Sequence, residues 1–217
     1  MTTSPQTIHT LADLLDRLGG VSPDRVRFEP PPGTATEADL LAVEQREGRL
    51  CELVDGVLVE KPMGYRESLV ASTLNRFLGT FVTARDLGLV SGEAGMMRLF
   101  PGLVRIPDVA FAAWDRFPDR RAVDSPIPDL VPSLAVEVLS RGNTEAEMAR
   151  KLAEYFAAGV QLVWLVDLNT RTVVCYTAPD RSVTLQAEDA LDGGAVLPGF
   201  SLPLRELFSD VDRAARR

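Results

Sequence analysis

The stretch SLAVEVL at residues 133–139 reads as a β-strand that is apolar on both sides. One side carries Leu134, Val136 and Val138, and the other carries Ala135 and Leu139. Such a strand is typical of the centre of a sheet that is covered on both faces. Its only charged residue is Glu137, and an unpaired buried carboxylate is strongly unfavourable. The sequence therefore predicts a partner for Glu137: a cation, a metal ion or a hydrogen-bond donor.

The next segment, residues 143–159 (NTEAEMARKLAEYFAAG), supplies a candidate partner. Thr144 and Glu147 fit a helix capping box, which predicts a helix that starts here. Its apolar face is formed by Met148, Leu152, Tyr155 and Gly159 at helical spacing. Lys151 lies at the edge of that face, so we expect it to reach the end of the Glu137 strand.

A second buried strand is predicted upstream at residues 105–113 (RIPDVAFAA), and Asp108 is the acid inside it. Pro107 lacks an N–H group, which places it at an edge, a bulge or a strand start. Two acids on neighbouring buried strands with a lysine nearby are typical of a divalent-cation phosphodiesterase. In such a site Asp108 and Glu137 hold Mg²⁺, or Mn²⁺ in its place, and the lysine orients or deprotonates the attacking water.

Composition narrows the class of protein. The chain has 217 residues, of which 46% are hydrophobic and 25% charged, as in an ordinary globular domain. We expect no membrane span, because no run of 18 apolar residues occurs, and no secretory signal in residues 1–10. Cys51 and Cys175 are expected to be small buried side chains in a reducing cytoplasm.

The residue inventory also excludes several chemistries. The single histidine, His9, argues against catalytic triads, Cys-His dyads and His-rich zinc sites. Neither a Walker A motif nor a GxGxxG motif is present. Any chemistry must therefore use carboxylates and lysine. The net charge of −8 argues against a non-specific nucleic-acid binder but leaves room for local basic patches.

Along the chain we predict three parts: an N-terminal helix and Pro-rich linker (1–35), one main domain (36–208) and a polar tail (209–217). Asp55-Gly56 between apolar runs predicts a β-hairpin, and Glu52 lies in its first arm. A long helix is expected at 67–87. The loop at 115–132 suggests a flap or an interface. We expect exposed apolar side chains at Trp114, Phe117 and Val174, and from them a homodimer whose two sites would suit a DNA duplex.

Several motifs resemble a known family. They are CELVDG at 51–56, IPDV at 106–109, LAVEVLS at 134–140, VWLVD at 163–167 and LPGF at 197–200. Each is weak alone, but their order and spacing resemble the Uma-type family of bacterial restriction-endonuclease-like proteins, within the PD-(D/E)XK nuclease superfamily. The resemblance covers about residues 41–208.

The resemblance implies an α/β, restriction-endonuclease-like core with a mixed, curved central sheet flanked by helices. It implies that Asp108 and Glu137 are the metal-binding acids and that Glu52 is an auxiliary acid. The lysine expected two residues after Glu137 is absent, since Leu139 stands there, and Lys151 matches its position on the next helix. The family often has Pro after the strand's serine, where this chain has Arg141.

Three readings stay open from the sequence. Asp108 and Glu137 could be a structural pair satisfied by Lys151 or backbone donors. The protein could be a Mg²⁺-dependent endonuclease acting on DNA. Alternatively, it could be a non-catalytic or regulatory nucleic-acid-binding module that keeps the nuclease fold.

Overall fold

The computed structural model describes residues 8–62, 64–209 and 212. Its centre is a six-stranded mixed sheet in the order β10-β9-β8-β7-β6-β3. The strands are β3 (Gly88–Ser91), β6 (Val109–Ala113), β7 (Leu134–Leu139), β8 (Leu162–Asp167), β9 (Thr172–Ala178) and β10 (Arg181–Leu185). β7 and β8 run parallel and the other neighbouring pairs run antiparallel.

The remaining strands form two smaller sheets. A four-stranded antiparallel sheet has the order β2-β1-β5-β4, with β1 (Cys51–Val54), β2 (Val57–Glu60), β4 (Met97–Phe100) and β5 (Leu103–Arg105). β1 and β2 form the predicted hairpin around Asp55-Gly56, which both have positive φ. A two-stranded sheet pairs β11 (Ala190–Asp192) with β12 (Ser201–Pro203).

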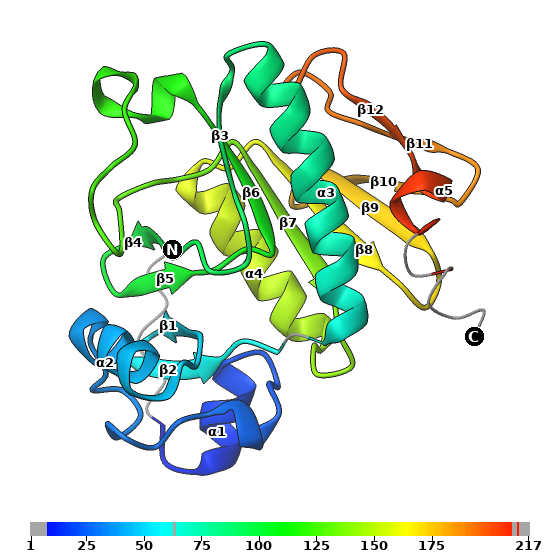
Figure 1. The fold of residues 1–217 in the computed structure, drawn as a ribbon. Helices are drawn as coiled ribbons and strands as arrows, with labels where there is room; N and C mark the ends of the chain where they lie inside the picture. The colour runs from blue at the N-terminus through cyan, green and yellow to red at the C-terminus, as the bar shows by residue number, and fades with distance from the viewer. Residues whose placement is uncertain (1–7, 63, 210–211, 213–217) are drawn as a thin grey trace.

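The helices are α1 (Leu11–Arg17), α2 (Glu37–Glu47), α3 (Tyr65–Ala84), α4 (Glu145–Ala158) and α5 (Leu204–Leu207). α3 and α4 cover opposite faces of the six-stranded sheet (Figure 1). α4 connects the parallel strands β7 and β8, which need such a crossover.

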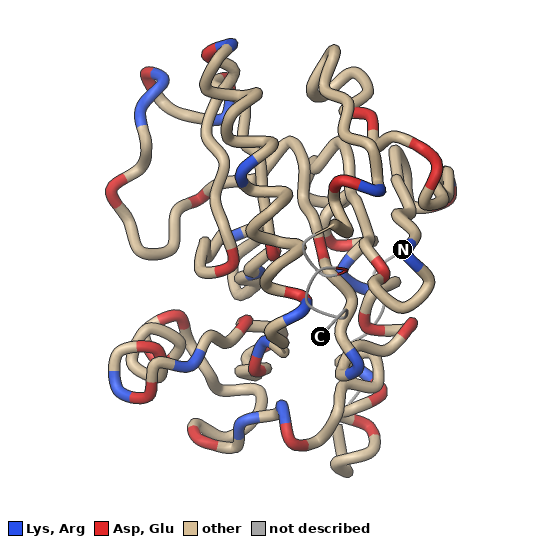
Figure 2. Tube along the Cα trace, turned by 45° about the vertical axis from the view of Figure 1, so that its right-hand side comes forward, with Lys and Arg blue, Asp and Glu red and all other residues tan. Residues whose placement is uncertain are grey.

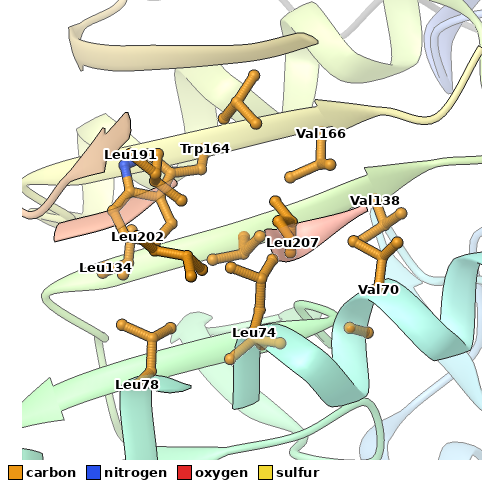
Figure 3. Close-up of a cluster of buried hydrophobic side chains, with 14 of the residues drawn as sticks. Val70, Leu74, Leu78, Leu134, Val138, Trp164, Val166, Leu191, Leu202 and Leu207 are labelled. Atoms are coloured by element: carbon orange, nitrogen blue, oxygen red, sulfur yellow. The ribbon is translucent and has the colours of Figure 1, made fainter. Parts of the chain in front are cut away.

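The central strand β7 divides the core as its sequence predicts. Leu134, Val136 and Val138 face α3, where Val70, Leu74 and Leu78 meet them (Figure 3). Ala135 and Leu139 face α4, where Met148, Leu152 and Tyr155 meet them. Glu137 belongs by alternation to the α4 side of the sheet.

The N-terminal segment packs onto the small sheet and onto the start of α4. Leu14 and Leu18 join a cluster with the β1–β2 hairpin. Arg25 forms a buried bidentate pair with Glu147, at 2.7 and 2.9 Å. Thr144 accepts the N–H of Glu147, so one half of the predicted capping box forms while the Glu147 carboxylate goes to Arg25.

Two expectations prove wrong. Residues 105–113 do not form one strand: β5 belongs to the small sheet and β6 to the large one, with Ile106-Pro107-Asp108 crossing between them. Pro107 cannot donate to a ladder, so pairing breaks there. Phe117 is buried rather than exposed. It follows the 3₁₀ turn Trp114–Arg116, and its ring packs edge-on against the Trp114 ring, with 5.7 Å between the ring centres. Trp114 and Val174, which were also expected to be exposed, are partly buried against the same cluster.

The C-terminal tail predicted for 209–217 lies mostly outside the described residues. Asp212, which is described, pairs with Arg171. Among the described residues, no helix is both long and apolar enough to cross a membrane.

Candidate active site

The predicted site residues lie where the two larger sheets meet. Glu52 comes from β1 of the four-stranded sheet, and Glu137 comes from β7 of the six-stranded sheet. Asp108 stands in the crossing between them, and Lys151 reaches in from α4. All four residues are buried, with exposures between 1% and 5%. Burial of this many charged groups requires that each has partners.

Both carboxylate oxygens of Glu137 are engaged by α4. Lys151 Nζ donates to Oε2 at 3.1 Å, and the Tyr155 hydroxyl donates to Oε1 at 2.5 Å. Lys151 and Tyr155 are four residues apart, so they lie on one face of the helix. The prediction from the sequence that Lys151 reaches Glu137 is therefore seen in the geometry, and Tyr155 adds a second contact.

Lys151 also joins the two sheets. Its ammonium group lies 3.0 Å from Glu52 Oε1 as well as 3.1 Å from Glu137. The other oxygen of Glu52 accepts from Arg105 at 2.7 Å, and Oε1 also accepts the backbone N–H of Ile106 at 3.1 Å. Arg105 continues the network to Glu154 of α4. Glu52 is thus held by two cations and one backbone donor.

Asp108 is held by a second lysine. Lys61, directly after β2, places Nζ 2.8 Å from Asp108 Oδ1 and donates to the Ile106 carbonyl at 2.5 Å. Asp108 Oδ2 accepts the N–H of Val138 at 2.6 Å. The Asp108 carboxylate therefore lies against the backbone of the residue next to Glu137.

The electrostatics of the cluster fix its protonation. Burial raises the pKa of Glu137; Lys151 opposes this shift and Asp108 adds to it. Burial would also raise the pKa of Glu52, but Lys151 and Arg105 outweigh it and hold that pKa well below its usual range. Burial lowers the pKa of Lys151, yet Glu137 and Glu52 raise it by more, so the net pKa is above the ordinary lysine value. Lys151 is therefore an ammonium ion at neutral pH.

The structure thus gathers Glu52, Glu137 and Lys151 by direct contact and brings Asp108 to the backbone beside Glu137. Sequence reasoning missed Lys61, Arg105 and the role of Tyr155. Tyr155 could have been found, because it lies one turn after Lys151 on the face that packs on Glu137. Nothing in the local sequence links Lys61 to Asp108, since the contact depends on how the two sheets meet.

The donor chemistry fits a hard divalent cation. Carboxylate oxygens are the ligands that Mg²⁺ takes, and Mg²⁺ is commonly held by one or two carboxylates, with water and substrate phosphate completing its shell. Within the described part of the chain, no three Asp, Glu, Cys or His side chains form a ready-made metal cage. The metal ligands Asp108 and Glu137 therefore stay a prediction.

Asp108 also lines a surface groove beside α3, with a volume of about 530 Å³. The other walls come from the polar flank of α3 and the turn after β3. In the view of Figure 2, basic and acidic residues are interspersed along the trace. Attraction of a polyanion would therefore depend on local cations rather than on a wholly basic surface.

Comparison with known proteins supports the resemblance. A family model named Uma2, described as "Putative restriction endonuclease", matches residues 37–205. A solved structure of "a putative nuclease belonging to DUF820" from Anabaena variabilis superposes with a TM-score of 0.66 at 20% identity, covering 75% of this chain and 91% of that chain. No curated protein matches this sequence. The fold is thus the α/β, restriction-endonuclease-like fold predicted from the sequence, and the chain belongs to the Uma2 family of restriction-endonuclease-like proteins.

Proposed function

We propose that the protein is a Mg²⁺-dependent endonuclease that hydrolyses phosphodiester bonds in DNA. The observation that supports this most is the placement of Lys151 between two buried carboxylates, with Asp108 alongside and open to a groove. In the reaction, the oxygen of water forms a bond to phosphorus and the bond to the leaving ester oxygen breaks. One proton leaves the water, and the leaving oxygen takes up a proton.

Asp108 and Glu137 would hold the metal ion, and Mn²⁺ would replace Mg²⁺ because it accepts the same oxygen ligands. When bound, the ion supplies charge stabilisation at the phosphoryl oxygens and lowers the pKa of coordinated water. Tyr155 fixes the orientation of the Glu137 carboxylate by holding Oε1. Glu52, which is itself held by Arg105, binds the same ammonium group of Lys151.

Lys151 would act as a fixed positive charge rather than as a base. Glu137 and Glu52 raise its pKa, which favours the protonated ammonium form. It can stabilise the negative charge that develops on the phosphoryl oxygens, a contact of the kind that is strongest in the transition state.

The test is a metal-dependent cleavage assay on supercoiled plasmid, linear duplex, single-stranded DNA and RNA. We expect cleavage of DNA with Mg²⁺ or Mn²⁺, none with EDTA, and none by Asp108→Asn. Asp180→Asn is the matched control, because Asp180 is an exposed acid on a turn. This variant should cleave DNA like the wild type. Cleavage that persists in EDTA, or at full rate in Asp108→Asn, would refute the proposal.

The same assay addresses the alternative of a non-catalytic nucleic-acid-binding module. That alternative expects binding without cleavage under every metal condition. We also propose a homodimer, because a two-fold axis would place two sites on one duplex. An exposed Phe117 no longer supports it, since Phe117 is buried. Light scattering at micromolar concentration tests the homodimer. A protein that is monomeric both free and bound to DNA would refute it.

A further inference from the structure

We propose that the groove beside Asp108 binds the phosphodiester backbone of a nucleic-acid strand, with Arg76 as its phosphate-binding residue. This inference rests on the proposed function, since it names the surface that would present substrate to the acids. The groove is lined by Ser68, Ala71, Ser72, Asn75 and Arg76 of α3, by Gly92 and Glu93, and by Asp108.

The helix presents two different flanks. Val70, Leu74 and Leu78 are fully buried against the sheet. Ser68, Ser72, Asn75 and Arg76 recur at intervals of three and four residues along a neighbouring flank, so they share one side of the helix. The polar flank therefore lines one groove together with Asp108.

Small residues keep this groove open. Ser68 and Ser72 are short, and Gly92 has no side chain on the facing wall. A Cβ at Gly92 would lie 3.3 Å from Asn75 Nδ2, so even a methyl group would crowd the amide. Glycine at position 92 thus leaves the Asn75 amide its space where the two walls approach each other.

Arg76 is a cation without an acidic partner among the described residues. Its guanidinium lies 4.4 Å from the centre of the Phe77 ring and is exposed to solvent. Arg98 and Arg105, in contrast, are each bound by two carboxylates. A planar guanidinium with free N–H groups matches the geometry of a phosphate, which it can bind through two parallel hydrogen bonds.

The rest of the lining agrees with a phosphodiester strand. Amide and hydroxyl groups such as those of Asn75 and Ser72 commonly bind phosphate and sugar oxygens, and such contacts position a strand without reading its sequence. Glu93 on the opposite wall repels phosphate, so it confines the backbone to the Arg76 side. A chain with a net charge of −8 needs such a local cation to accept a polyanion.

The test measures binding of fluorescein-labelled single-stranded and duplex DNA by anisotropy in EDTA, where metal-dependent cleavage cannot occur. Arg85→Ala is the matched control for Arg76→Ala. Arg85 is also exposed, at the end of α3, and stacks on Phe81 at 3.9 Å, but it does not line the groove.

We expect Arg76→Ala to weaken binding roughly tenfold or more, the size expected for loss of one charge-assisted bond. The slope of log K against log salt should become shallower by about 0.7–0.9, as for one lost phosphate contact. Arg85→Ala should leave both quantities unchanged, and Glu93→Gln should strengthen binding. The inference would be overturned if Arg76→Ala and Arg85→Ala had equal effects or if the wild type did not bind DNA. It would also be overturned if polyglutamate competed as effectively as unlabelled DNA.

The outcome is separable from the outcome for the proposed function. If the wild type cleaves DNA but Arg76→Ala binds and cleaves equally well, the groove assignment fails and the nuclease stands. If Arg76→Ala loses binding as expected while the wild type never cleaves, the groove stands and the nuclease fails.

Discussion

Replacement of Lys151 by methionine tests the centre of the site most directly. Methionine keeps helix propensity and most of the aliphatic volume while it removes the ammonium group. Glu137 then loses the one cation that lies within hydrogen-bond distance of it among the described residues, and it keeps Tyr155. Glu52 keeps Arg105 and the Ile106 N–H. The structural cost therefore falls mainly on Glu137.

Removal of one partner from a buried ion pair destabilises proteins by about 3–5 kcal/mol. For a chain of this length each kcal/mol lowers the melting temperature by about 2–4 °C, so we expect a fall of roughly 6–20 °C. In a nuclease, loss of a charge that acts in the transition state should also lower turnover by about 10²–10³. The assay measures melting and cleavage on the same sample, with cleavage expressed per folded molecule.

Two further variants make the experiment decisive. Arg150→Met is the matched control, because Arg150 is the preceding residue on α4 and its pairs with Asp55 and Glu154 are partly exposed. Such pairs contribute about 0–1 kcal/mol each. Adding Glu137→Gln to Lys151→Met should recover part of the lost stability, since the orphaned charge has gone. The buried-pair reasoning is refuted if Lys151→Met melts no earlier than Arg150→Met, and the catalytic role is refuted if cleavage per folded molecule is unchanged.

Three other predictions concern single contacts. Tyr155→Phe removes the hydroxyl that donates to Glu137 and should cost about 1.5–3 kcal/mol in urea unfolding; no loss would mean that this bond contributes nothing to stability. Burial would raise the pKa of Glu147, but Arg25 outweighs it and the pKa is lowered, so this pair stabilises the fold above about pH 4.3 and loses that contribution as the pH falls further. A melting-temperature profile across acid pH should therefore be flatter in Glu147→Gln, and an unchanged profile would contradict the assignment. Gly56→Ala should lower the melting temperature clearly, because Gly56 has φ of +73° and an added Cβ would lie 2.6 Å from neighbouring backbone atoms; a wild-type melting temperature would contradict this reading.

Local pattern was enough to predict the contact between Glu137 of β7 and Lys151 of α4, though not the bond from Tyr155. Glu137 is one acid in an apolar strand, and Lys151 lies on the edge of the next helix's apolar face. Because strand and helix adjoin in the chain, the two periodicities fix which side chains meet. The observed contact of 3.1 Å between Lys151 and Glu137 agrees with that expectation.

Contacts between the two sheets could not be read in the same way. The apolar run around Asp108 looks like one strand, and only the tertiary structure shows that the chain passes from one sheet to the other at Pro107. Lys61 stands after a strand and before Pro62, a position typical of an exposed turn, yet its side chain is 4% exposed. The packing of β2 against the crossing segment decides that contact, and no periodicity in either segment encodes it.

The charge balance of the cluster argues that it is more than a structural network. Four carboxylates and three cations share it: Glu52, Asp108, Glu137, Glu154, Lys61, Lys151 and Arg105. Buried ion pairs are often no more stabilising than apolar side chains of the same volume, and the same chain meets a structural need with the two-residue pair of Arg25 and Glu147. A cluster with more carboxylates than cations at a sheet junction, with Asp108 lining a groove, would become more positive on binding a divalent cation. That change would favour a phosphodiester in the adjoining groove, as the proposed function requires.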